Sequence, residues 1–182
     1  MHYNFQAIPP EVNSANIFGG PGPDSMYAAA NKWAKLADQM AYAPGLFGEV
    51  LSLLNEKWSG PAAMQMAQAA APYRAWLITL IRQITETAAV AFRIMDAYAA
   101  ACKAAVDPDD IDYNREQRMA LIASQRFGEY AEAIAQLDAE YLKFWAEDAM
   151  TMETYAAEVL DALSELTPWQ QPPEITNEAE LV

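Results

Sequence analysis

Two long stretches of the chain carry apolar residues at alternating steps of three and four. The first runs from Met26 to Trp58 and the second from Ala63 to Ala105. Such spacing keeps the apolar positions on one stripe of a helix. Between the stretches lies Trp58-Ser59-Gly60-Pro61, in which the glycine favours a helix end and the proline a helix start. The pattern predicts a long helical hairpin with Trp58 at its tip.

The remaining elements are shorter. Pro44 interrupts the first arm, but the apolar phase continues through it, so we expect a bend rather than an end. We expect a short helix at Pro9-Pro10-Glu11, a polar helix over 110–124, a turn over 125–128 and a long helix over 129–166. The predicted fold class is all-α, an elongated bundle of about five helices. We assign residues 1–169 to one domain and residues 170–182 to a disordered acidic tail containing prolines.

Each arm of the hairpin also has a second apolar face. The first arm offers Leu36, Ala43, Leu46, Val50 and Leu53, and the second offers Ile81, Ala88, Phe92, Met95, Ala99 and Cys102. A helix that is apolar on two faces must be covered on both. The last long helix can cover one side of the hairpin, which leaves the other side for another chain.

Composition narrows the classes of partner. The formal net charge is -14, which makes nucleic acid and anionic membrane poor partners. The single cysteine, Cys102, excludes an intrachain disulfide, and its phase predicts a buried position. We find no signal peptide, and the longest uncharged stretch, 58–73, is too short and too proline-rich to span a bilayer. The protein either stays in the cytoplasm or leaves by a route that does not read an N-terminal signal peptide.

The chain lacks the residues that most catalytic or metal sites need. Its only histidine is His2, and there is no glycine-rich phosphate-binding motif. We interpret the acidic pairs as charges on the solvent face of a bundle; they include Asp138, Glu140, Glu147 and Asp148. We therefore expect that the protein is not an enzyme and that it binds no cofactor or metal ion.

Four short motifs occur in a fixed order along this helical pattern. They are Pro9-Pro10-Glu11 with the following Asn13-Ser14, Gly20-Pro21-Gly22, Trp58-Ser59-Gly60 and Leu166-Thr167-Pro168-Trp169. On these motifs the chain resembles the PPE proteins of mycobacteria over about residues 5–169. Many of those proteins continue into a long C-terminal region that this sequence does not contain.

The resemblance implies an elongated domain that pairs with a two-helix PE protein to form a four-helix bundle. The expected interface residues are Met40, Phe47, Leu51, Leu54, Leu77, Leu80, Ile84 and Ile94. It further implies export by a type VII (ESX) secretion system to the cell surface or outside, with a role in host interaction or envelope transport. In such pairs the PE chain supplies Tyr-x-x-x-Asp/Glu and the PPE chain supplies Trp-x-Gly. None of the nine tyrosines here has an acidic residue four positions later.

A second implied site is the turn between the last two helices. There the family presents a hydrophobic pair to a cytosolic EspG-type chaperone, and Leu121-Ile122 occupies that place with Phe127 close by. The alternative is that Leu121 and Ile122 are ordinary core residues. For the whole chain, the alternative is a cytosolic helical scaffold or a homodimer that covers the same apolar stripes with a second copy.

Overall fold

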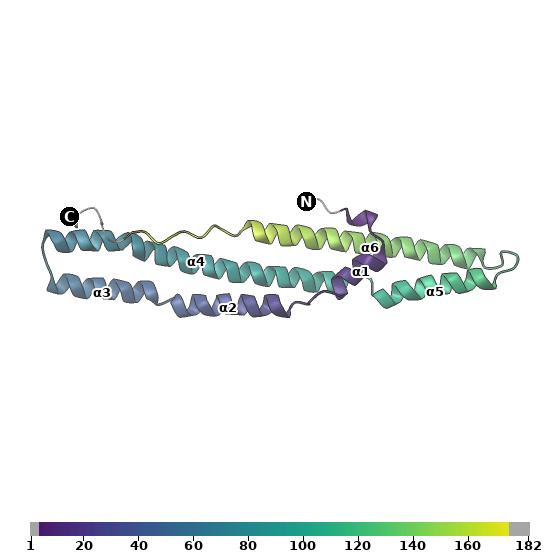
Figure 1. The fold of residues 1–182 in the computed structure, drawn as a ribbon, viewed down its shortest axis with the longest axis horizontal. Coiled ribbons are helices and arrows are strands. Elements are labelled where there is room, and N and C mark those ends of the chain that lie inside the picture. The colour runs from purple at the N-terminus through teal and green to yellow at the C-terminus, as the bar shows by residue number, and fades with distance from the viewer. Residues whose placement is uncertain (1–3, 175–182) are drawn as a thin grey trace. The chain divides into compact units, whose positions relative to one another are not determined.

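The computed structural model describes residues 4–174, and every regular element in this range is helical (Figure 1). The elements are η1 (Phe5–Ala7), α1 (Pro10–Phe18), α2 (Asp24–Met40), α3 (Ala43–Lys57), α4 (Pro61–Ala104), α5 (Pro108–Ser124) and α6 (Ala131–Ser164). The all-α prediction is confirmed. In the described part of the chain, no helix is both long and apolar enough to cross a membrane.

The chain divides into two compact units, and α4 contributes to both. The hairpin unit consists of Tyr27–Phe92 and the segment from Ser164 on. The acidic unit consists of the segment up to Met26 and Arg93–Leu163. Each unit is therefore built from two separate stretches of sequence.

The predicted hairpin forms the core of the hairpin unit. Trp58 caps the end of α3 in an extended conformation, and its backbone N–H donates to the carbonyl of Leu54 at 2.9 Å. Gly60 adopts a φ of 114°, and Pro61 is the first residue of α4. A positive φ is costly for residues with a Cβ, so the turn requires glycine at this position.

The first arm is two helices, so the prediction of one bent helix was wrong. α2 ends at Met40 and α3 begins at Ala43. Pro44 has no N–H to donate to the carbonyl of Met40, so the helical hydrogen bonds cannot continue through this point. Proline is tolerated in a first turn, and Pro44 lies in the first turn of α3. Because of this break, the described residues form six α-helices rather than about five.

Small side chains dominate the interior of the hairpin unit. Its buried apolar residues include Ala30, Ala37, Ala63, Ala70, Leu77 and Ile84. Alanine lets two helices approach closely, and larger rings fill the space nearer the turn, where Phe47 packs on Tyr73 with ring centroids 5.3 Å apart. The first predicted stripe of each arm therefore faces the other arm.

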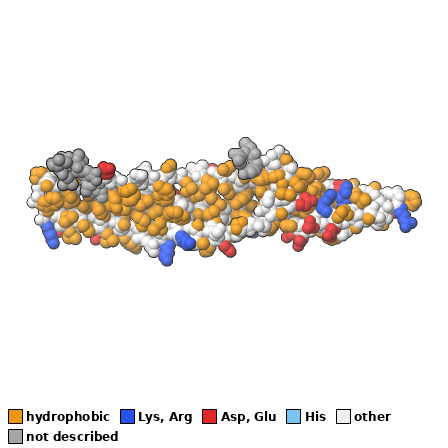
Figure 2. Space-filling model, in the orientation of Figure 1, with side chains coloured by type: hydrophobic (Ala, Val, Ile, Leu, Met, Phe, Trp, Pro, Cys, Tyr) orange, Lys and Arg blue, Asp and Glu red, His pale blue; other side chains and the backbone are white. Residues whose placement is uncertain are grey.

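The acidic unit carries the negative charge of the chain. Its two stretches of sequence contain six basic and seventeen acidic residues, whereas Tyr27–Phe92 of the hairpin unit contains five basic and four acidic ones. The buried apolar side chains of the acidic unit include Ile17, Ile111, Ala149 and Ala162. Cys102 is half-buried rather than fully buried. Hydrophobic side chains are prominent over α3 and the first half of α4, and acidic ones gather near the start of α5 (Figure 2).

One predicted boundary shifts for a local reason. α5 begins at Pro108 rather than near Asp110, because the Asp107 carboxylate accepts the N–H of Asp109 at 2.9 Å and caps the helix. Gln170, in the predicted tail, lies outside the regular elements, and its carbonyl accepts a hydrogen bond from Trp76 Nε1 at 2.9 Å. Residues 175–182 of the predicted tail lie outside the described residues.

Candidate interaction sites

The Trp-x-Gly motif occupies the turn of the hairpin. The Trp58 side chain is 45% exposed, and Ser59 and Gly60 are also exposed. Because Trp58 ends α3 and Gly60 supplies the positive φ, the motif combines a structural turn with an accessible indole. The structure places the three predicted residues together at one solvent-facing point.

The Pro-Pro-Glu motif instead fixes α1 within the acidic unit. Pro9 is the N-cap of α1, and Pro10 is its buried first residue. The Glu11 carboxylate accepts a hydrogen bond from the Tyr141 hydroxyl, with O···O distances of 3.0 and 3.1 Å. Burial and the hydrogen bond to Glu11 raise the pKa of Tyr141. The Arg115 guanidinium lies 4.3 Å from the centre of the Tyr141 ring, so this tyrosine joins α1, α5 and α6.

Ser14 and Asp148 both form hydrogen bonds with the backbone of Val106. Ser14 Oγ donates to the carbonyl of Val106 at 2.8 Å, and Asp148 Oδ1 accepts the N–H of Val106 at 2.9 Å. Asp148 is fully buried, so its assignment to the solvent face was wrong. Burial raises the pKa of its carboxyl group, and the hydrogen bond from Val106 partly offsets the rise. Helical spacing places Asp148 on the side of the apolar stripe, three residues after Trp145 and four before Met152, so its charge rather than its spacing led to the solvent-face interpretation.

The other acidic residues of that group have varied surroundings. Asp138 is half-buried and forms an ion pair with Arg118, which lowers the pKa of Asp138. The Glu140 carboxylate accepts a hydrogen bond from the buried Asn114 amide at 2.8 Å. Among the described residues, no group of three His, Cys, Asp or Glu side chains could hold a metal ion.

The turn between α5 and α6 presents a hydrophobic surface. Phe127 is 97% exposed, Ile122 is exposed and Leu121 is half-buried. The Glu129 carboxylate accepts the backbone N–H of Phe127 at 2.8 Å and that of Arg126 at 3.0 Å. These backbone hydrogen bonds lower the pKa of Glu129. The turn is thereby held in a shape that leaves the Phe127 ring in solvent.

The second predicted face of the first arm is open. We call it the α2–α3 stripe, and its exposed members are Leu36, Leu46, Val50 and Leu53, with Leu54 beside them. Most of the residues expected to meet a partner lie instead on the first predicted stripe of this arm and on the stripe of α4 that faces it. Of those, Leu77 and Ile84 are buried, Met40, Phe47, Leu51, Leu80 and Ile94 are half-buried, and Leu54 is exposed.

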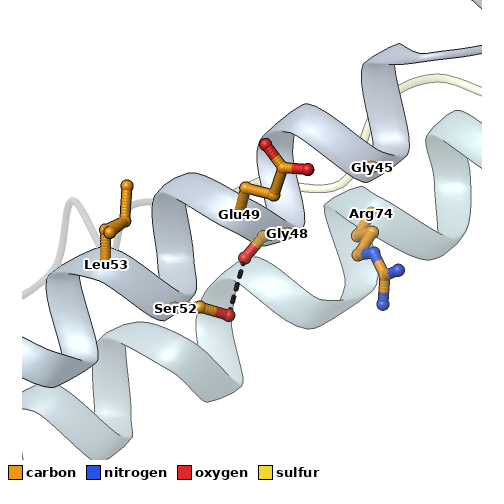
Figure 3. Close-up of a pocket in the computed structure, with 6 residues that line it drawn as sticks. All are labelled: Gly45, Gly48, Glu49, Ser52, Leu53 and Arg74. Atoms are coloured by element: carbon orange, nitrogen blue, oxygen red, sulfur yellow. Dashed lines mark hydrogen bonds between the residues drawn. The ribbon is translucent and has the colours of Figure 1, made fainter.

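A shallow hollow of about 550 Å³ lies along α3 and α4 (Figure 3). Its lining residues are Gly45, Gly48, Glu49, Ser52, Leu53 and Arg74. Arg74 Nε donates to the carbonyl of Pro44 at 3.1 Å, and a Cβ on Gly48 would lie 3.3 Å from the same nitrogen. The hollow brings together one carboxylate, one guanidinium and the hydroxyl of Ser52, which donates a hydrogen bond to the carbonyl of Gly48 at 3.0 Å.

Comparison with known proteins agrees with the motifs. The model of the PPE family matches residues 4–167. The chain belongs to the PPE family. It is 44% identical over 182 residues to the PPE family protein PPE41 of Mycobacterium tuberculosis, covering all of this chain and 93% of that protein. It is 40% identical over 178 residues to PPE29 and 41% identical over 179 residues to the transporter PPE51, both of M. tuberculosis.

These alignments differ in how much of each relative they cover. In both cases the alignment covers 98% of this PPE chain, but only 42% of PPE29 and 47% of PPE51. It therefore corresponds to less than half of those two PPE proteins and to nearly the full length of PPE41.

Proposed function

We propose that this PPE chain is a non-enzymatic secretion substrate that works as one half of a heterodimer with a two-helix PE protein. The observation that carries the proposal is the α2–α3 stripe. Its large aliphatic side chains are exposed along one flank of the hairpin unit. Soluble monomers rarely expose contiguous apolar surface of this extent, and such surfaces usually mark interaction sites.

The dimensions and charge of the stripe suit a helical partner. From Leu36 to Leu53 the first arm spans about 26 Å, at 1.5 Å per residue. Residues 1–106 carry equal numbers of basic and acidic residues, so a partner helix would meet little net charge there. Met40, Phe47, Leu51 and Leu54 would border the contact, with Leu77, Leu80 and Ile84 beneath them and Ile94 further along α4. Two partner helices laid along this flank would complete a four-helix bundle.

The two exposed turns supply the remaining functions in this proposal. Trp58, Ser59 and Gly60 form the PPE part of a composite export signal for a type VII (ESX) system. The Tyr-x-x-x-Asp/Glu part comes from the PE protein. Leu121, Ile122 and Phe127 bind an EspG-type chaperone in the cytosol before the pair is exported to the cell surface or outside. The transporter name of PPE51 supports envelope transport as a role of the exported pair.

Co-expression with a PE-family protein tests the heterodimer. We expect the chain to be poorly soluble alone and to co-purify as a 1:1 complex with a cognate PE protein. Leu46→Asp and Val50→Asp should abolish co-purification, because each places a charge in the stripe. Leu142→Asp is the matched control, since Leu142 is an equally exposed leucine on α6.

The alternative function has a distinct outcome in the same experiment. A stable homodimer of the chain that forms without a PE protein, and that Leu46→Asp disrupts, would favour the cytosolic scaffold. A clean monomer at micromolar concentration would contradict both readings, because it would show that the stripe needs no cover.

A further inference from the structure

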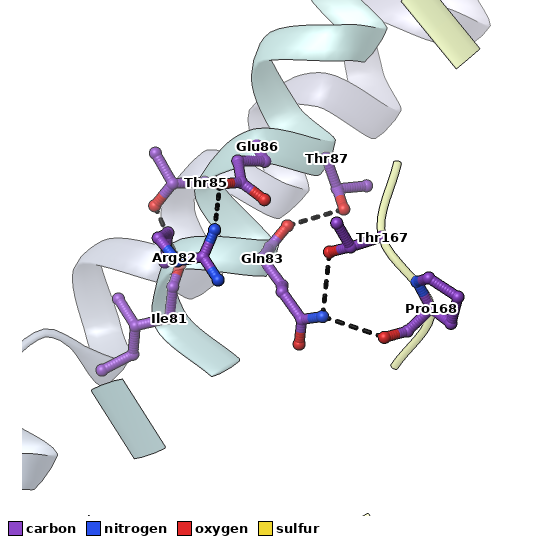
Figure 4. A network of polar contacts seen from close by, with 8 residues as sticks. All are labelled: Ile81, Arg82, Gln83, Thr85, Glu86, Thr87, Thr167 and Pro168. Atoms are coloured by element: carbon purple, nitrogen blue, oxygen red, sulfur yellow. Dashed lines mark hydrogen bonds and ion pairs between the residues drawn. The ribbon is translucent and has the colours of Figure 1, made fainter. Parts of the chain in front are cut away.

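The segment Leu166–Pro173, which we call the C-terminal strap, has no regular secondary structure. It is hydrogen-bonded to α4 within the hairpin unit. Gln83 Nε2 donates to Thr167 Oγ1 at 3.0 Å and to the carbonyl of Pro168 at 2.9 Å (Figure 4). Trp76 Nε1 donates to the carbonyl of Gln170 at 2.9 Å. Trp76 and Gln83 are seven residues apart on α4, so they lie on one face of that helix two turns apart.

The contact with Gln83 fixes the path of the strap. Gln83 is only 5% exposed, and its amide nitrogen uses its hydrogen bonds on the strap. Losing the strap would leave this amide nitrogen without hydrogen-bond partners. That loss would cost free energy, because an unpaired buried amide is unfavourable. Figure 4 shows the Gln83 side chain extending from α4 toward Thr167 and Pro168. The strap is therefore positioned by a specific polar contact.

This clamp places Trp169 on the first arm of the hairpin. The ring of Trp169 stacks on that of Trp33, with centroids 5.8 Å apart and an angle of 20° between the planes. Trp169 nevertheless remains 50% exposed. One side of its indole covers Trp33, and much of the rest faces solvent.

Trp169 stacks on a residue that neighbours Leu36, the first member of the α2–α3 stripe. Trp33 and Leu36 are three residues apart on α2, so their side chains are neighbours on the helix surface. The ring of Trp169 is therefore one side chain removed from the α2–α3 stripe, because it stacks on Trp33 and Trp33 neighbours Leu36. Without the strap, Trp33 would lose the ring that covers it, and Leu36 would be the end of the stripe.

We propose that the C-terminal strap is a positioning element that adds Trp169 to the docking surface as an aromatic anchor for the partner. The inference rests on the proposed function, since the occupant is the two-helix PE-type protein. It assigns the Leu-Thr-Pro-Trp motif a part in partner binding. The partner would present an apolar helical face to Trp169, because half of this indole is exposed beside an apolar stripe. Exposed tryptophans that are rigidly held commonly dominate binding energy at interfaces.

The test measures how fast a labelled PE protein dissociates from the purified heterodimer of the full chain. Trp169→Ala should increase the dissociation rate about 10- to 100-fold, the usual range for loss of an aromatic anchor. Trp169→Phe should stay within about threefold, because it keeps an apolar ring on Trp33. Tyr113→Ala is the matched control, since Tyr113 is an exposed aromatic residue on α5, outside the docking surface.

Gln83→Leu separates positioning from simple stability. It should release the strap and raise hydrogen exchange at the backbone amides of 166–170. It should also accelerate dissociation, and Trp169→Ala should add little in the double variant. An unchanged dissociation rate for Trp169→Ala would overturn the inference. A slower rate would also overturn it, because the strap would then cover the docking surface instead of extending it.

The wild-type chain distinguishes failure of the proposed function from failure of the inference about the strap. If it forms no heterodimer with a cognate PE protein, the proposed function fails. If the heterodimer forms but is insensitive to Trp169→Ala, the inference about the strap fails alone.

Discussion

The hydroxyl of Tyr141 donates to the carboxylate of Glu11, 130 positions earlier in the chain. This hydrogen bond connects the motif after which the family is named to the middle of α6. The motif is therefore a packing element of the acidic unit, distinct from the surfaces proposed to meet partners. Pro10 is buried beside it and starts α1, so all three motif residues contribute to the same junction.

Removing this hydroxyl should weaken the acidic unit. Tyr141→Phe keeps the ring under Arg115 but leaves the half-buried Glu11 carboxylate without its donor. We expect a loss of about 1 kcal/mol in the free energy of unfolding, measured by urea denaturation. Tyr113→Phe is the control, since Tyr113 is largely exposed, and it should change stability by less than about 0.5 kcal/mol. Equal effects of the two variants would contradict the assigned role.

The buried carboxyl of Asp148 should make stability depend on pH. Burial raises its pKa, so at pH values between the ordinary aspartate pKa and this higher value the folded chain keeps a proton that the unfolded chain has lost. The contribution of Asp148 to the free energy of unfolding should therefore decrease as pH rises through this window. Asp148→Asn keeps an oxygen for the N–H of Val106 and should remove that decrease, giving a more stable protein at neutral pH.

Denaturation of both proteins across this pH range checks the prediction. The difference between Asp148→Asn and the wild type isolates one carboxyl group from the many others in the chain. Glu147→Gln should reduce the pH dependence only partly, because burial raises the pKa of Asp148 more than the neighbouring charge of Glu147 does. A constant difference between Asp148→Asn and wild type at all pH values would refute the assignment.

Gly60 should be needed for the turn itself. Its φ of 114° is strained for any residue with a Cβ, so Gly60→Ala should cost about 1–2 kcal/mol in the free energy of unfolding. Gly45→Ala is the matched control, because Gly45 is helical and a Cβ there would meet no atom within 4 Å. That change should be neutral or stabilising by about 0.5–1 kcal/mol. Thermal or urea unfolding of the two variants would compare them directly.

Trp58 should matter for export rather than for pairing. Trp58→Ala removes a partly exposed side chain at a helix end, so stability should change by less than about 0.5 kcal/mol. We expect co-purification with the PE protein to be retained while the amount of both proteins outside the cell falls at least tenfold. Comparison of culture filtrate and cell lysate measures this. Loss of the heterodimer in Trp58→Ala would instead make Trp58 a packing residue.

Phe127 provides a sharper test of chaperone binding than Leu121. Leu121 is half-buried, so Leu121→Asp should weaken chaperone capture but would also disturb the fold. Phe127→Ser changes only an exposed side chain and should reduce capture by an EspG-type chaperone at least tenfold without lowering the unfolding temperature. Leu142→Ser, at another exposed site of the acidic unit, should leave capture intact. A pull-down with purified chaperone would show whether the two variants differ.

The sequence predicted the helical hairpin well, because Gly60 and Pro61 carry local backbone requirements that do not depend on the rest of the fold. It did not predict the break before Ala43. The apolar phase passes unchanged from Ala37 through Met40 to Pro44, so periodicity carried no mark of the interruption. A proline inside a periodic stretch fits both a bend and a new first turn, and the surrounding packing decides between them.

Which apolar stripe is open could not be read from periodicity either. Leu77 and Leu46 both follow helical spacing, yet one is buried against the other arm and the other is exposed. The candidate sites around Trp58 and Phe127 rest on the family motifs rather than on helical spacing, and their roles stay predictions. The contacts of Gln170 and Asp148 depend on residues dozens of positions away, and no local pattern indicated them.

The single helix α4 has a consequence for how the protein folds and can be divided. It begins in the hairpin unit and ends in the acidic unit, and each unit also needs a second stretch from elsewhere in the chain. A cut near Phe92 would leave each fragment without part of its unit. The first fragment would lack the segment from Ser164 on, and the second would lack the segment up to Met26. The two units should therefore melt in one cooperative transition, and proteolysis should yield no stable fragment that corresponds to either unit.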